Sequence, residues 1–178
     1  VGSEMCIRDS SIAIGKAGDV AVVNNSGQLF IINNQMIKET FTLKTGNAET
    51  FYTCCKYMDN GDLLVGTTTN EMYRLRKTNG KYRTIKRYTT GNLQQISSIA
   101  SDDQGNYWVC SGSGIGYLQR EKFHTFDTNT FNSSIDNMTM DYQGNLWFTS
   151  SRLGLLKLSK TCFTDLFRQY SLEKRVVN

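Results

Sequence analysis

Two ten-residue segments with nearly the same sequence decide the fold of this chain. The first, DDQGNYWVCS, occupies residues 102–111, and the second, DYQGNLWFTS, occupies residues 141–150. Both contain Asp, Gln, Gly, Asn, Trp and Ser at the same places. Self-similarity of this kind indicates a repeat architecture, in which each copy forms one supersecondary unit.

Two weaker copies precede this pair. They are GKAGDVAVVN at residues 15–24 and MDNGDLLVGT at residues 58–67. The glycines that anchor the four copies are separated by 43, 44 and 39 positions, and they are Gly18, Gly61, Gly105 and Gly144. A spacing of about 40 to 45 residues is typical of a four-stranded propeller blade.

Each copy predicts short strands joined by tight turns. An apolar-rich segment such as 96–100 ends at a D-x-x-G turn, where Asp and Gly suit the first and last positions. The aromatic and β-branched residues that follow, as in 106–111, favour a second strand. A small-residue loop leads to a third strand, and a more polar outer strand such as 122–126 closes the unit.

These repeats predict an all-β fold, a partial β-propeller of about four four-stranded antiparallel blades that is a fragment of a larger ring. One such sheet cannot bury both of its faces alone, so neighbouring blades must cover one another. The chain has no Trp-Asp dipeptide, and each tryptophan follows its turn glycine by three residues. This placement argues against WD repeats.

Composition and charge exclude several classes of protein. The 178 residues include 15 glycines and no proline, so Gly, Asn and Asp must make the turns. The net charge is +4 with no basic block longer than two residues, which argues against a nucleic-acid surface. No apolar run approaches the roughly 18 residues that a transmembrane helix needs.

The five cysteines form no C-x-x-C pair, and His124 is the only histidine. Too few ligands stand at suitable spacing for a zinc site or a histidine-dependent metal site. The sequence therefore predicts neither a metal nor a cofactor, and we interpret the adjacent Cys54 and Cys55 as packing thiols.

The pattern D-x-x-G-N-L-W-x-x-[ST] followed by G-[LI]-x-x-L resembles the two-component regulator propeller repeat. It is clearest in residues 141–158 and 102–118. The resemblance implies a sensor region outside the cytoplasmic membrane of a membrane-bound bacterial receptor. It also implies an output domain such as a histidine kinase or diguanylate cyclase, signalling that involves ligand binding or propeller dimerisation, and frequent recognition of carbohydrates.

The ends of the chain do not follow the repeat. Residues 1–10 resemble translated adapter sequence, so we expect the propeller to occupy residues 11–178. Residues 163–178 read as an outer strand leading into a further blade, which suggests a piece of a longer receptor.

Candidate ligand-binding residues lie in the loops that a propeller gathers around its channel. We single out Arg152, Asn70, Ser113 and Asn25, although turn geometry is the more common reason for such residues in hairpin loops. The prominent residues of the repeat have structural interpretations as turn or packing residues, and they are Asp102, Gly105, Trp108, Asp141, Gly144 and Trp147.

Two alternatives to a non-enzymatic sensor remain. One is a propeller enzyme of the streptogramin-lyase type, whose repeats look similar but whose acid-base chemistry uses histidine. The other is a passive scaffold for protein interactions. The unknown partners of the sensor are a small-molecule or carbohydrate ligand, further blades and output domains, and a second copy in a homodimer.

Overall fold

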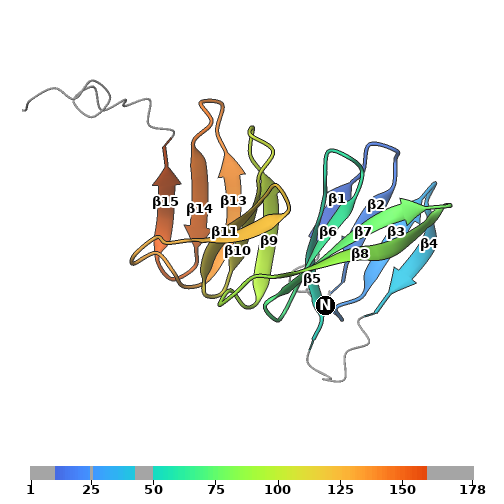
Figure 1. Ribbon diagram of the computed structural model, residues 1–178, viewed down its shortest axis with the longest axis horizontal. Helices are drawn as coiled ribbons and strands as arrows, with labels where there is room; N and C mark the ends of the chain where they lie inside the picture. The colour runs from blue at the N-terminus through green and yellow to red at the C-terminus, as the bar shows by residue number, and fades with distance from the viewer. Residues whose placement is uncertain (1–10, 25, 43–49, 160–178) are drawn as a thin grey trace, which may run out of the picture.

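The computed structural model describes residues 11–24, 26–42 and 50–159, and these form fifteen β-strands. The strands make four antiparallel sheets, each built from consecutive strands in chain order (Figure 1). The predicted all-β propeller of four blades is confirmed. The expected tail at 1–10 and further blade at 163–178 lie outside the described residues.

The first two blades are complete four-stranded sheets. The first contains β1 (Ser11–Ile14), β2 (Val20–Val23), β3 (Leu29–Asn33) and β4 (Met36–Phe41). The second contains β5 (Tyr52–Tyr57), β6 (Leu63–Thr67), β7 (Glu71–Thr78) and β8 (Lys81–Thr89).

The third blade is also four-stranded, and the described part of the fourth has three strands. The third contains β9 (Ile96–Ser101), β10 (Tyr107–Ser111), β11 (Gly114–Gln119) and β12 (Lys122–Phe126). The fourth contains β13 (Ile135–Met140), β14 (Leu146–Ser150) and β15 (Gly154–Leu158).

The D-x-x-G segments form the turns between the first and second strand of their blades. Gly105 and Gly144 adopt φ values of +80° and +81°, a backbone conformation that other residues rarely take. No atom lies within 4 Å of where a Cβ would stand on Gly105. The turn therefore requires glycine there for its backbone conformation and not for lack of space.

Three hydrophobic clusters fill the spaces between neighbouring sheets. Leu29 and Leu63 belong to the cluster between the first and second blades, and Ile96 belongs to the cluster between the second and third. Trp108 and Phe148 meet between the third and fourth blades with ring centroids 5.6 Å apart. Each blade thus supplies one wall of its neighbour's core, as the repeat predicts.

The described cysteines are buried in these clusters as free thiols. Burial raises the pKa of Cys54 to about 12 and the pKa values of Cys55 and Cys110 to about 11. Thiols with such pKa values are protonated and unreactive at neutral pH, which agrees with a packing role.

The first strand of each blade lies on the inside of the arc. β5 contacts β1 on one side and β9 on the other, and β9 contacts β13. These four strands are β1, β5, β9 and β13, and they face a common concave surface. Among the described residues no helix has the length and apolar character that a membrane crossing requires.

Candidate functional site

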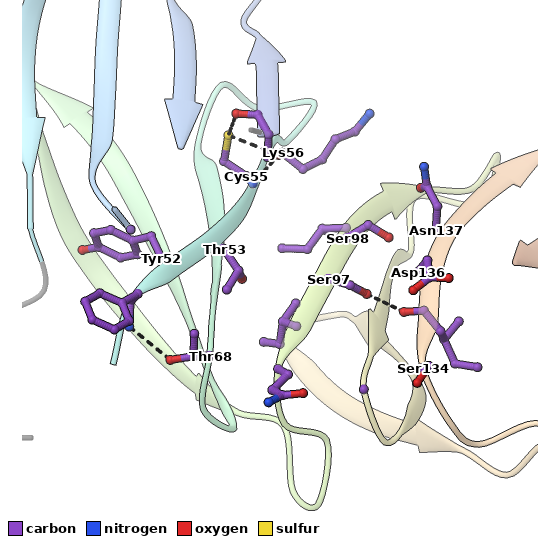
Figure 2. Close-up of a pocket in the computed structure, with 18 of the residues that line it drawn as sticks. Tyr52, Thr53, Cys55, Lys56, Thr68, Ser97, Ser98, Ser134, Asp136 and Asn137 are labelled. Carbon is purple, nitrogen blue, oxygen red and sulfur yellow. Dashed lines mark hydrogen bonds between the residues drawn. The ribbon is translucent and has the colours of Figure 1, made fainter. Parts of the chain in front are cut away.

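A cavity of about 1110 Å³ lies on this concave surface and receives residues from all four blades. Its walls are the inner strands, and its rim is made by the loops at one end of them (Figure 2). Most of its side chains are hydroxyls and amides, from Ser11, Asn24, Thr53, Thr68, Gln95, Ser97, Ser98, Ser134, Asn137 and Ser151.

Three of the four inner strands carry a β-bulge at the same place. The pairing register skips Thr53 in β5, Ser97 in β9 and Asp136 in β13. Each of these residues stands eight positions before the anchor glycine of its blade, and each lines the cavity. Bulges re-aim side chains and are over-represented beside functional sites. The repeat therefore places one irregular polar residue per blade at the cavity.

A belt of backbone hydrogen bonds runs around the rim from blade to blade. Within the second blade the amide of Thr68 donates to the carbonyl of Phe51 at 3.0 Å. The amide of Gln95 then donates to the Thr68 carbonyl at 3.1 Å, and the amide of Gly112 donates to the Gln95 carbonyl at 3.1 Å. The amide of Ser134 completes the series on the Gly112 carbonyl at 3.0 Å.

The bulged side chains add to this belt. In the fourth blade the amide of Ser151 donates to the carboxylate of Asp136 at 2.6 Å, where the earlier blades use a backbone carbonyl. The hydroxyl of Ser97 donates to the carbonyl of Ile135 in the next blade at 2.5 Å. The Ser97 bond links neighbouring blades, as the Gln95 and Ser134 amide bonds do, so the rim is a connected surface.

Three of the four loop residues expected to bind ligand are described, and they do not line this cavity. The side-chain amide of Asn70 donates to the Gly91 carbonyl at 3.0 Å, and the hydroxyl of Ser113 donates to the Asn92 carbonyl at 3.0 Å. Arg152 is exposed, and its backbone amide donates to the hydroxyl of Ser150. Asn25 lies outside the described residues.

The repeat aspartates organise their turns. The carboxylate of Asp102 accepts hydrogen bonds from the amides of Gln104 and Asn106, from the Asn106 side chain, and from the indole of Trp108 at 2.9 Å. Burial by itself would raise the pKa of Asp102, but these bonds lower it overall. This hydrogen bond to the indole was not predicted from the sequence. The sequence does contain an indication of it, because Asp and Trp stand at the same spacing around the turn in both clear repeats.

Asp141 forms the same arrangement in the fourth blade. It accepts a hydrogen bond from the indole of Trp147 at 2.9 Å, and this bond with those from Asn145 and Gln143 lowers the pKa of Asp141 to about 2. The ammonium of Lys157 lies 4.9 Å from the centroid of the Trp147 ring. These contacts give Asp141 and Trp147 a local structural role.

Sequence reasoning missed the bulged residues of the cavity. The signal for them was present, since Thr53, Ser97 and Asp136 share one offset from the anchor glycines. Each is a polar residue directly after an apolar first residue of its strand, and this alternation predicts a side chain on the opposite face.

The described residues contain no group of three His, Cys, Asp or Glu side chains that could hold a metal ion. His124 belongs to the outer strand β12, away from the cavity, and its ring stacks on Tyr117 with centroids 5.2 Å apart.

Comparison with solved structures places this chain among the β-propellers. Extracellular domains of two proposed signalling systems from Bacteroides thetaiotaomicron match it. The hybrid two-component system gives a TM-score of 0.68 at 20% identity over 89% of this chain and 23% of its own. The one-component system gives 0.65 at 12% identity over 86% and 22%.

Virginiamycin B lyase from Staphylococcus aureus is similar to the same extent. Its TM-score is 0.64 at 18% identity over 85% of this chain and 55% of its own. No family model and no curated protein matches the sequence. The chain also matches a Bacteroides caccae protein of unknown function, of which it covers 60%. Across these solved structures it spans between 22% and 60% of the matched chain. At these identities the likeness shows the fold alone.

Proposed function

We propose that this chain is part of a ligand-sensing propeller in an extracytoplasmic, membrane-anchored bacterial receptor that acts in two-component or cyclic-dinucleotide signalling. The observation that carries the proposal is the polar cavity built jointly by the inner strands of four blades, with a bulged polar residue in three of them. The repeat sequence and the similar extracellular domains of proposed signalling systems support it.

A shared cavity suits a sensor for a thermodynamic reason. A ligand shifts a conformational equilibrium only by its difference in affinity for the two states. A ligand that contacts several blades at once favours the arrangement in which those contacts form together. The backbone belt from Phe51 to Ser134 would carry that preference along the rim, toward further blades, an output domain or a second copy of the receptor.

Two alternatives make different use of the same surface. A propeller enzyme is favoured by the likeness to virginiamycin B lyase, but within the described residues the cavity lining includes no histidine. A passive scaffold would need a partner protein and no soluble ligand. The cavity favours the sensor over the scaffold, because a concave site toward which several polar groups converge suits a small molecule.

One experiment separates the three. The purified chain is screened by thermal unfolding against soluble sugars, peptides and organic acids, and each stabilising compound is then incubated with the protein and followed by NMR. A sensor is stabilised by a compound that stays unchanged, since binding to the folded state alone raises the unfolding temperature. Conversion of the compound would favour the enzyme, and absence of any stabilising compound would favour the scaffold.

A further inference from the structure

Two opposite charges face the cavity from different walls. Lys56 comes from β5 and Asp136 from β13, and β9 lies between these strands (Figure 2). They are the only charged residues of the cavity lining in the described part of the chain. The rest of the lining is neutral, so these two groups dominate its electrostatics.

Neither charge is neutralised by an ion pair within residues 11–24, 26–42 and 50–159. Asp136 accepts one hydrogen bond, from the amide of Ser151 to Oδ2, which leaves Oδ1 available. Two uncompensated charges of opposite sign in one cavity favour a ligand that carries both complementary charges.

The separation of the two strands sets the size of that ligand. β5, β9 and β13 belong to three different sheets, and packed sheets lie about 10 Å apart face to face, so the backbones of β5 and β13, on either side of β9, are separated by roughly 10 Å or more. An extended peptide rises about 3.3 Å per residue. A peptide of three residues is about 10 Å long and matches the lower end of this separation, whereas the charges of a free amino acid lie too close together.

The neutral lining suits the same chemistry. Hydroxyl and amide groups of Thr53, Ser97 and Asn137 can exchange hydrogen bonds with peptide groups. The side chains of Phe51 and Ile12, which are 44% and 63% exposed, offer an apolar surface beside them. A volume of about 1110 Å³ holds a ligand of a few residues.

We infer that the cavity binds a short zwitterionic peptide of about three residues, with its carboxylate at Lys56 and its ammonium at Asp136. This inference deepens the proposed sensing function, on which it rests, by naming the class of ligand.

The test is isothermal titration of the 178-residue chain with trialanine and three related compounds. N-acetyl-trialanine lacks the ammonium, trialanine amide lacks the carboxylate, and alanine carries both charges close together. We expect trialanine to bind with a dissociation constant below about 1 mM and each of the other three at least about fivefold more weakly, the effect of one partly exposed ion pair.

Two variants test which residue binds the carboxylate of the peptide and which binds its ammonium. Lys56→Gln is expected to bind trialanine and its amide equally, because the partner of the carboxylate is gone. Asp136→Asn keeps an oxygen for the Ser151 amide and is expected to bind trialanine and its acetyl derivative equally. The control Lys81→Gln removes an exposed lysine of β8 outside the cavity. It should still bind trialanine more tightly than the amide and more tightly than the acetyl derivative.

The outcomes separate this inference from the function on which it rests. Equal binding of all four compounds, or none, would overturn the peptide assignment. Binding of a neutral trisaccharide in place of trialanine would overturn it as well, yet would leave the sensing proposal standing. Cleavage of trialanine during the titration would contradict the sensing proposal and leave the ligand class intact.

Discussion

At the scale of single residues, each blade has an aspartate beside its turn glycine, and the partners of that carboxylate differ from blade to blade. Asp102 and Asp141 precede the turn glycine and hold a tryptophan indole. In the first two blades an aspartate follows the glycine. Asp19 accepts hydrogen bonds from Asn33, Lys77 and Tyr82, and Asp62 pairs with two arginines. A carboxylate beside the turn thus has hydrogen-bond or ion-pair partners in every blade, and the two that are buried, Asp19 and Asp62, need such partners most.

Replacement of Asp102 tests this role. Asp102→Ala leaves the indole N–H of Trp108, a residue only 7% exposed, without its acceptor. We expect the free energy of unfolding to fall by about 2 kcal/mol, the usual cost of a buried unsatisfied donor together with lost turn bonds. Urea unfolding followed by tryptophan fluorescence measures it. Gln104→Ala, an exposed change in the same turn, should alter stability by less than about 0.5 kcal/mol, and equal losses in both variants would contradict the assigned role.

Glu121 makes stability depend on pH. Hydrogen bonds from Tyr88 and Lys86 lower its pKa to about 2 against the opposing effect of desolvation, and Arg74 contributes as well. Its ordinary pKa is 4.5, so its ionised form stabilises the fold above that pH, and the contribution is lost as the pH falls from 4.5 to about 2.

We therefore expect Glu121→Gln to unfold more easily than the unaltered chain at pH 7. The difference should be about 1 kcal/mol because the side chain is half exposed and solvent screens the pairs. It should shrink progressively below pH 4.5, as measured by urea unfolding at several pH values. A difference that is constant from pH 7 to pH 2.5 would contradict the assignment.

At the scale of elements, the strands pack so closely that one of them needs glycine. A Cβ on Gly66 in β6 would lie 2.6 Å from Cγ2 of Ile96 in the next blade and 2.7 Å from Sγ of Cys54. Gly66 has no positive φ, so the requirement comes from these two side chains, one in the next blade and one in β5 of the same blade, and not from its own backbone.

Gly66→Ala should consequently destabilise the chain by about 1 to 3 kcal/mol, the usual cost of overpacking. Ile96→Ala removes one of the two clashing atoms and leaves Sγ of Cys54 in place, so the double variant should lose less stability than the sum of the two single variants. Thermal or urea unfolding of the unaltered chain, the two single variants and the double variant measures the coupling free energy between Gly66 and Ile96. Strict additivity would mean that the two blades do not meet at this point.

The strands could be predicted from the sequence because turn chemistry and strand composition are local. Asp102 to Gly105 and Asp141 to Gly144 specify turns, and the segments after them are rich in aromatic and β-branched residues. The bulges at Thr53, Ser97 and Asp136 were not predicted, because the shared offset of these polar residues marks their place in the repeat but not the register of the facing strand, on which a bulge depends.

At the scale of the whole molecule, the propeller was predictable from its period, whereas its cavity was not. The cavity is made by strands about 40 residues apart in the sequence, and its rim is held by backbone groups, which leave no side-chain signature. The loop residues chosen from the sequence, Arg152, Asn70 and Ser113, lie beside that rim and outside its lining. Polar loop residues are common for reasons of turn geometry, so composition alone could not rank them.

The proposed function requires that the four inner strands form one ligand site. Chemical-shift mapping of the ¹⁵N-labelled chain, with a compound that raises its unfolding temperature, tests this most directly. We predict that the perturbed amides lie around Thr53, Ser97 and Asp136, in three different blades at once. Perturbations confined to the outer strands β8 and β12, or to the single loop at Arg152, would contradict the claim.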